Sequence, residues 1–259
     1  MTAIHPTAVV SSRARLAADV RVGPYAVIGA GVEIGNDCEI GSHAVVEGPT
    51  RMGARNVVHP HAAIGRDPQD RKFQPGEASR LEIGDGNTIR EFVTINRGTE
   101  AGGGVTRIGN GCWLMASAHI AHDCIVGDDV VMANFASVAG HVQVGNHVTM
   151  AGFAGAHQFC RIGDYSFVGI YSGVTRDVPP YVLVAGQPPK PRGVNVTGLR
   201  RHGFSAGQRV NIERAYRTLY RRGLSRAEAV EAIAESAGEQ PELDRLIQFL
   251  AESGRGLLR

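Results

Sequence analysis

Four histidines lie close together in the second half of the sequence, and an aspartate directly follows one of them. They are His119, His122, His141 and His157, and Asp123 follows His122. A neutral imidazole takes a proton from an attacking hydroxyl group near pH 7, and an adjacent carboxylate orients the ring and stabilises its protonated form. This combination favours general-base chemistry of the kind that acyl transfer requires.

A short repeat predicts the elements that position these histidines. Aliphatic anchor residues recur at every sixth position over most of the chain, and a glycine often follows the anchor. A fixed period this short predicts a parallel β-helix, in which three hexads make one triangular coil of eighteen residues. The anchors are Ile4, Val10, Leu16, Val22, Ile28, Ile34, Ile40, Val46, Met52, Val58 and Ile64, then Ile83, Ile89 and Ile95, then Ile108, Leu114, Ile120, Val126, Met132, Val138, Val144, Met150, Ala156, Ile162, Val168 and Val174.

The coil length predicts which distant residues share a column. Eighteen positions after His122 stands Gly140, and the same step leads from Asp123 to His141. Coils stack about 4.8 Å apart, so the columns bring these residues into one patch. The N–H of Gly140 is expected to stabilise a developing oxyanion, because glycine allows close approach to the backbone. The predicted patch contains His122, Asp123, Gly140, His141, His157 and Gln158.

Two other interpretations of the cluster are open. Histidines also serve as polar corners of a coil, and we interpret His5, His43, His59, His61, His147 and His202 as surface residues of that kind. Alternatively, zinc enzymes with this fold hold the metal with histidines from two subunits. Asp123 beside His122 favours base catalysis over ligation. We therefore expect neither a metal nor another cofactor.

Composition indicates an ordinary globular chain with a basic end. The net charge is +2, and 43% of the 259 residues are hydrophobic. Residues 187–259 carry 13 Lys and Arg against 8 Asp and Glu, which favours an acidic partner, but no nucleic-acid-binding motif accompanies them. The sequence shows neither a signal peptide nor a membrane span. Cys38, Cys112, Cys124 and Cys160 each precede an anchor by two residues and are predicted to be core thiols, which fits the cytoplasm.

Interruptions of the repeat predict loops and a second domain. The register breaks between Ile64 and Ile83 and again between Ile95 and Ile108, and the first break predicts an external loop around residues 66–80. After the last hexads, Ser205 with Gln208 and Ser225 with Glu228 form capping boxes of two helices. Pro241 suits the first turn of a third helix that ends near Ser253. We predict a β-helix domain over 1–186 and a small helical domain over 187–259.

Several segments resemble one family, the UDP-N-acetylglucosamine O-acyltransferases of lipid A biosynthesis. They are PQDRKF (68–73), RLEIGDGNTIREFVTINRGT (80–99), AHIAHDCIVG (118–127), AGHVQVG (139–145), AHQFCRIGD (156–164), SGVTRDVPPYV (172–182), GVNVTGLRRHGF (193–204) and the ending RGLLR. The resemblance implies a left-handed β-helix that forms a homotrimer. It also implies transfer of an (R)-3-hydroxyacyl group from acyl carrier protein to the 3-hydroxyl of UDP-N-acetylglucosamine.

The resemblance also implies roles for individual residues. His122 is the general base, Asp123 its partner and Gly140 the oxyanion donor. The cleft is lined by His119, His141, His157 and Gln158. Asp70 and Lys72 reach the substrate across a subunit boundary, and Asn195 and Arg201 contact the nucleotide. The basic C-terminal region suits the acidic carrier protein.

Three positions depart from the family pattern. Position 197 is Thr where an acidic residue is frequent, and position 96 is Asn where some members have His. Position 170 is Ile, whereas long-chain members have Gly at the floor of the acyl groove. An Ile side chain fills the space of several methylenes. We therefore expect a donor of medium length, unless Ile170 points elsewhere.

Other functions remain open at this stage. A related enzyme of the same pathway acylates an amine, but it carries an extra N-terminal domain, whereas the hexads here begin at Ile4. The same reaction on a 3-amino sugar nucleotide is a second alternative. A non-catalytic scaffold of this fold is the third.

Overall fold

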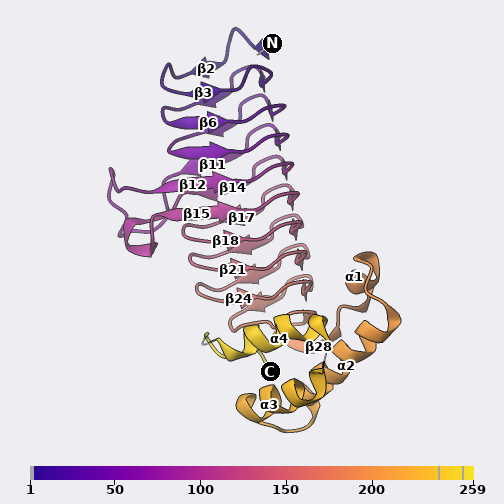
Figure 1. The fold of residues 1–259 in the computed structure, drawn as a ribbon. Helices are drawn as coiled ribbons and strands as arrows, with labels where there is room; N and C mark the ends of the chain where they lie inside the picture. The colour runs from indigo at the N-terminus through magenta and orange to yellow at the C-terminus, as the bar shows by residue number, and fades with distance from the viewer. Residues whose placement is uncertain (1–2, 239, 253) are drawn as a thin grey trace.

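The chain forms a three-sided stack of coils with helices at its C-terminal end (Figure 1). The computed structural model describes residues 3–238, 240–252 and 254–259. Three sheets make the three sides, and nearly all of their strand pairs are parallel. The β-helix followed by helices that the hexads predicted is confirmed.

The bounds of the strands follow the hexads. Sheet A contains β1 (Ala3–Ile4), β4 (Arg21–Val22), β7 (Glu39–Ile40), β10 (Val57–Val58), β13 (Thr88–Ile89), β16 (Trp113–Leu114), β19 (Val131–Met132), β22 (Thr149–Met150), β25 (Phe167–Val168), β27 (Val182–Ala185) and β28 (Lys190–Val194). Sheet B contains β2 (Val9–Val10), β5 (Val27–Ile28), β8 (Val45–Val46), β11 (Ala63–Arg66), β14 (Thr94–Asn96), β17 (His119–Ile120), β20 (Ser137–Val138), β23 (Gly155–Ala156) and β26 (Gly173–Val174). Sheet C contains β3 (Arg15–Leu16), β6 (Val32–Ile34), β9 (Thr50–Met52), β12 (Arg80–Ile83), β15 (Val105–Ile108), β18 (Ile125–Val126), β21 (Gln143–Val144) and β24 (Arg161–Ile162).

The anchor residues fill the interior of the coil. Ile120 is fully buried and pairs across the ladder with Val138, which is also fully buried. The four cysteines are buried and unpaired, as predicted. Burial raises the pKa of the Cys124 thiol to about 12, because an apolar interior disfavours the thiolate. These thiols are therefore inert packing groups.

The corners of the coil use left-handed backbone. Asp123 has φ 59° and His141 has φ 62°, and they occupy the same corner one coil apart. Aspartate and histidine are among the non-glycine residues that adopt this conformation most often. At another corner the rings of Tyr25, His43 and His61 stack at centroid distances of 5.0 Å. His43 and His61 are exposed, as expected, but they belong to an aromatic stack.

Both register breaks are excursions from the coil. The first runs from β11 to β12 and lacks regular secondary structure over residues 67–79, within the range predicted for an external loop. The second lies between β14 and β15 and contains one short 3-10 helix, η1 (Glu100–Gly102), whose N-cap is Thr99. Both excursions leave the stack near the same height (Figure 1).

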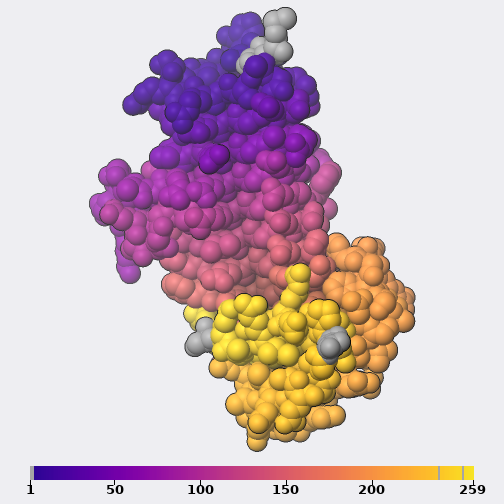
Figure 2. All heavy atoms as spheres, in the orientation of Figure 1, coloured from indigo at the N-terminus to yellow at the C-terminus, as the bar shows by residue number. Residues whose placement is uncertain are grey.

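The C-terminal segment is helical and closes the end of the stack (Figure 2). The helices are α1 (Val196–Arg201), α2 (Ala206–Arg221), α3 (Arg226–Ala237) and α4 (Pro241–Ala251). Both predicted capping boxes are present, at Ser205 and Ser225, and Pro241 lies in the first turn of α4. Helix α1 was not predicted from the sequence. The last helix was predicted to end near Ser253, which lies outside the described residues. The domain division at residues 186 and 187 stays a prediction.

Within residues 3–238, 240–252 and 254–259, no helix combines the length and the apolar character needed to cross a bilayer.

The stack predicts unequal stability losses in one anchor column. Ile40 is 2% exposed, whereas Ile4, in the terminal coil of the same sheet, is 43% exposed. Ile40→Ala should therefore lower the free energy of unfolding by about 2–5 kcal/mol, because it leaves a cavity. Ile4→Ala should lower it by well under half as much. Denaturant unfolding followed by circular dichroism measures both, and equal losses would contradict the packing described.

Candidate active site

A groove of about 540 Å³ runs over the outer face of sheet B. Its lining includes His119, His122, Gly140, His157, Gly155 and Gly173. The outward positions of β20, β23 and β26 are Ser137, Gly155 and Gly173, in direct cross-strand register. A Cβ added to Gly173 would meet no atom within 4 Å. The floor of the groove is therefore almost free of side chains.

His122 and Asp123 form a hydrogen-bonded pair at the edge of this groove. Nδ1 of His122 lies 2.8 Å from Oδ2 of Asp123. The side chain of Asp123 is only 1% exposed, and that of His122 is 15% exposed. With an ionised carboxylate as acceptor, Nδ1 carries the proton, and Nε2 is left with a lone pair that accepts one.

Asp123 is held from two sides by threonines. The N–H of Thr99 donates to Oδ1 at 2.9 Å, and its hydroxyl donates to Oδ2 at 2.7 Å. The N–H of Asp123 donates to Oγ1 of Thr106 at 2.8 Å. Burial alone would raise the pKa of Asp123, but hydrogen bonds from His122 and Thr99 outweigh it and hold this pKa below its usual value. The carboxylate is thus ionised although it is buried.

Gly140 lies against the ring of His122. A Cβ at this position would stand 2.6 Å from Cε1 and 2.8 Å from Nε2 of His122, so only glycine fits. Among the described residues, nothing accepts a hydrogen bond from the N–H of Gly140, although the residue is buried. A base and a free backbone donor therefore meet at one point of the groove.

Two further histidines flank the pair. Nδ1 of His119 lies 2.7 Å from Oγ1 of Thr94, and burial lowers the pKa of His119. The ring of His141 lies 5.2 Å from that of His122, edge to face, and stacks on Phe159 at 4.4 Å. Burial also lowers the pKa of His141, against the opposing charge of Asp123. Both imidazoles are therefore neutral near pH 7.

The same pair and His141 form a possible metal cluster. One ligand atom from each of His122, Asp123 and His141 lies within 4.8 Å of the others. However, both oxygens of Asp123 already accept hydrogen bonds from Thr99. The oxygens of Asp123 are thus engaged in hydrogen bonds, which suits a fixed carboxylate better than a metal ligand.

The remaining predicted cleft residues are only partly brought together. His157 lines the groove, whereas Gln158 is exposed and is not among the lining residues. In the excursion loop, Oδ1 of Asp70 accepts the N–H of Lys72 at 3.0 Å, and Lys72 is exposed. The carboxylate of Asp70 is close enough to raise the pKa of His141 slightly against burial. The loop residue that lines this chain's own groove is Gln69.

Three predicted residues lie away from the groove. Asn195 caps α1: its Oδ1 accepts the N–H of Gly198 at 3.1 Å, and its Nδ2 donates to the carbonyl of Tyr165 at 2.9 Å. Arg201 is exposed at the end of α1. Ile170 is 60% exposed at a corner and does not line the groove within this chain.

Sequence reasoning missed Thr99 and Thr106 as partners of Asp123. It also missed Ser137, Gly155 and Gly173 as the groove floor. The signal for the floor was present, because the eighteen-residue step relates these three positions. The only signal for Thr99 was that it lies in the second register break.

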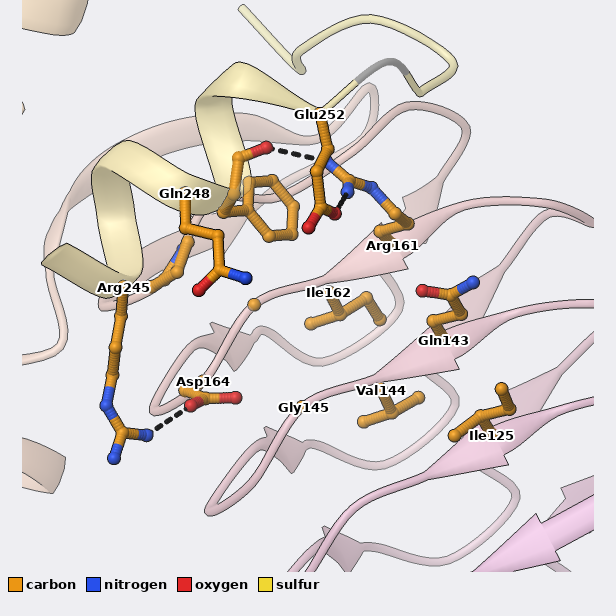
Figure 3. Close-up of a pocket in the computed structure, with 13 residues that line it drawn as sticks. Ile125, Gln143, Val144, Gly145, Arg161, Ile162, Asp164, Arg245, Gln248 and Glu252 are labelled. Atoms are coloured by element: carbon orange, nitrogen blue, oxygen red, sulfur yellow. Dashed lines mark hydrogen bonds and ion pairs between the residues drawn. The ribbon is translucent and has the colours of Figure 1, made fainter. Parts of the chain in front are cut away.

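A second hollow lies between sheet C and α4, where Figure 3 shows Gln143, Arg161, Arg245 and Gln248 pointing into it. Both of its arginines are already paired. Arg161 bonds Asp177 at 3.3 Å and Arg245 bonds Asp164 at 2.5 Å. The hollow contains none of the histidine cluster, so we interpret it as the joint that docks α4.

The sequence is similar to known families and to proteins of known name over its whole length. A family model described as "Udp N-acetylglucosamine O-acyltransferase; Domain 2" matches residues 177–258. A second one, "Bacterial transferase hexapeptide (six repeats)", matches residues 13–48 and 106–140. An acyl-[acyl-carrier-protein]–UDP-N-acetylglucosamine O-acyltransferase of Halorhodospira halophila is 55% identical over 259 residues, all of both chains. The protein of the same name from Thiobacillus denitrificans is 50% identical, again over all of both chains.

Solved structures show the same architecture. The UDP-N-acetylglucosamine O-acyltransferase of Moraxella catarrhalis superposes with a TM-score of 0.96 at 45% identity, covering 99% of each chain. A homologous structure from Acinetobacter baumannii gives a TM-score of 0.96 at 42% identity and 99% coverage of each chain. The fold is thus a left-handed parallel β-helix.

The buried carboxylate predicts a specific dependence of stability on pH. Because the pKa of Asp123 is lowered on folding, its ionised form contributes stability above the unfolded value of about 3.9, and this contribution disappears as the pH falls through the folded value. The stability difference between the wild type and Asp123→Asn should therefore be larger at pH 5 than at pH 3. Urea midpoints at the two pH values measure it.

A matched control exists at another corner. Asp37 is exposed and has φ 55°, the same left-handed conformation as Asp123. Asp37→Asn should show little difference from the wild type at either pH. If the Asp123→Asn difference grew on acidification, the carboxylate would not be stabilised in its ionised form.

Proposed function

The chain belongs to the acyl-[acyl-carrier-protein]–UDP-N-acetylglucosamine O-acyltransferase family, and from this premise we propose that it carries out the first step of lipid A biosynthesis. In this reaction an (R)-3-hydroxyacyl group passes from acyl carrier protein to the 3-hydroxyl of UDP-N-acetylglucosamine. The observation that carries the proposal is the His122–Asp123 pair beside the free N–H of Gly140.

The proposed mechanism uses this pair as a general base. Nε2 of His122 removes the proton of the sugar 3-hydroxyl as its oxygen attacks the thioester carbonyl of the donor. The negative charge that develops on the carbonyl oxygen is stabilised by the N–H of Gly140. When the tetrahedral intermediate collapses, the C–S bond breaks and the protonated His122 returns the proton to the carrier's sulfur. Asp123 stabilises the imidazolium between the two transfers.

The groove floor supports an extended apolar group as the transferred moiety. Ser137, Gly155 and Gly173 leave room for an extended acyl chain along β20, β23 and β26. We assign the polar contacts to the sugar and the acyl hydroxyl to His119, His141 and His157. His119 and His157 line the groove, and the ring of His141 packs edge to face against that of His122. Gln158, which follows His157 and is exposed, is the fourth residue to which we assign a substrate contact.

Nucleotide binding and assembly are further parts of the proposal. We assign nucleotide contacts to Asn195 and Arg201, because a guanidinium matches diphosphate geometry and the Asn195 amide keeps one hydrogen unused. In a homotrimer the half-buried Asp70 and the exposed Lys72 would reach the site of a neighbouring copy. The exposed Ile170 would likewise face an adjoining surface.

Location and donor recognition complete the proposal. The four unpaired, buried thiols fit a cytoplasmic protein. The arginine-rich surface of α2 suits an acidic carrier protein, mainly by steering its approach. No metal or other cofactor takes part in the proposed steps.

The test is a direct assay with a matched variant. Purified protein, UDP-N-acetylglucosamine and a series of 3-hydroxyacyl carrier proteins should give an O-acylated sugar nucleotide, detected by mass spectrometry. His122→Ala should lower kcat by about 10²–10⁴-fold, because the general base is lost. His5→Ala, at an exposed histidine in the first coil, should leave kcat unchanged.

Other outcomes separate the alternatives. Product only with a 3-amino sugar nucleotide would indicate the amine acceptor. Wild-type activity that is lost with a chelator and restored by Zn²⁺ would favour a zinc mechanism at the histidine cluster. Absence of product with every donor and acceptor would leave the scaffold alternative.

The acyl-chain length gives a separate prediction. Wild-type protein should prefer a donor of medium length, and Ile170→Gly should shift the preference by several methylenes towards longer chains. The exposed side chain of Ile170 has space to meet an acyl chain or a neighbouring subunit. The ratio of kcat/KM for long and medium donors measures the shift. An unchanged ratio would show that other residues set the length.

A further inference from the structure

The second excursion of the coil folds back over the carboxylate of Asp123. Thr99, at the start of η1, is 7% exposed and supplies two donors to that carboxylate. Its N–H meets Oδ1 at 2.9 Å and its hydroxyl meets Oδ2 at 2.7 Å. The two bonds engage both oxygens, so the carboxylate cannot rotate without breaking one of them.

The structure also fixes the direction of the hydroxyl proton. The N–H of Gly102 donates to Oγ1 of Thr99 at 3.0 Å, which uses a lone pair of that oxygen. The single proton of the hydroxyl is therefore free to point at Asp123. A Cβ on Gly102 would lie 2.2 Å from the carboxylate of Asp123, so the backbone of Gly102 packs directly against this carboxylate.

His141 competes for the same oxygen as His122. Nε2 of His141 stands 3.8 Å from Oδ2 of Asp123, whereas Nδ1 of His122 stands 2.8 Å from it. A modest rotation of the carboxylate would exchange one imidazole for the other. The two hydrogen bonds from Thr99 keep Oδ2 of Asp123 directed at His122.

We propose that Thr99 is a positioning residue of the acyltransferase, which holds Asp123 so that His122 keeps its Nδ1 proton and presents Nε2 to the substrate hydroxyl. This inference rests on the proposed general-base function of His122. Thr99, Asp123 and His122 then form one chain of hydrogen bonds, in which Thr99 belongs to the excursion and the other two residues to the adjacent corner. Thr99 touches neither substrate and acts only through Asp123.

The first experiment compares Thr99→Val with Thr99→Ser. Valine keeps the shape and the N–H but removes the hydroxyl, so kcat should fall by about tenfold to a hundredfold while KM stays unchanged. Thr99→Ser restores the hydroxyl and should return kcat to within a few-fold of the wild type. Equal losses in both variants would overturn the proposal, because they would show that shape alone matters.

The pH profile distinguishes positioning from a merely structural effect. A carboxylate that loses a hydrogen bond binds a proton more tightly. In Thr99→Val the His122–Asp123 pair should therefore retain the proton between its two side chains to higher pH. The acidic limb of kcat/KM should therefore move to higher pH in Thr99→Val. The charged groups near Asp123 are His122 and His141, with Arg161 and Arg255 lining the hollow on its other side, and the variant alters none of them. A profile that kept its shape would contradict the proposal.

A cap far from the site provides the matched control. Ser225 caps α3 with the same side-chain-to-backbone bond, in a region without contact to Asp123. Ser225→Ala loses a helix cap, as Thr99→Val does, and should lower the unfolding temperature while kcat and the pH profile stay unchanged. A comparable loss of kcat in Ser225→Ala would assign the Thr99 effect to stability.

A double-mutant cycle tests whether Thr99 acts through Asp123 and guards against a misfolded valine variant. In an Asp123→Asn background, Thr99→Val should cost little further kcat. If Thr99→Val does not fold, Gly102→Ala replaces it: its Cβ should displace the carboxylate and lower kcat, and Asp123→Ala should make that change neutral. Full additivity in the cycle would overturn the inference.

Activity that survives both His122→Ala and Asp123→Asn would instead overturn the proposed mechanism.

Discussion

The hydrogen-bonded register between successive coils is the constraint on which the whole site depends. Parallel ladders pair Ile120 with Val138 and Ile125 with Gln143, so in this part of the stack a side-chain position repeats after eighteen residues. Between these strands the N–H of His141 bonds the carbonyl of His122 at 3.0 Å. This register brings His122, Gly140 and His141, to which we assign the proposed chemistry, into one place.

The regular coil nevertheless supplies only part of the chemistry. A periodic corner offers a side chain to solvent, where a carboxylate and an imidazole would be hydrated and mobile. The excursion before β15 changes this by covering Asp123, whose side chain is 1% exposed and bonded to both donors of Thr99. Burial would favour the neutral acid, and the hydrogen bonds reverse that preference. The irregular segment thus converts a surface carboxylate into a fixed charge.

What the sequence could predict follows from this division. Everything periodic was accessible, including the three-sided stack, the buried cysteines, and the columns that join His122 to Gly140 and Asp123 to His141. The capping boxes of α2 and α3 were accessible because they depend on residues three apart. The contact of Thr99 with Asp123 was not accessible, because it depends on the path of a loop that has no repeat. The helix α1 was missed because its N-cap, Asn195, has neither the capping box that predicted α2 and α3 nor the proline that predicted α4.

The arrangement separates the groups that we propose to react from the surface that we propose to receive the acyl chain. The pair and the Gly140 N–H lie at a corner, where left-handed backbone turns side chains outward. The floor lies on flat strands, where Ser137, Gly155 and Gly173 succeed one another in register. No hydrogen bond connects these floor residues to Asp123 or Thr99 in the described part of the chain. Substitutions along the floor can therefore alter which chain fits while the proton transfer at the corner is unchanged, so one scaffold can serve donors of different length.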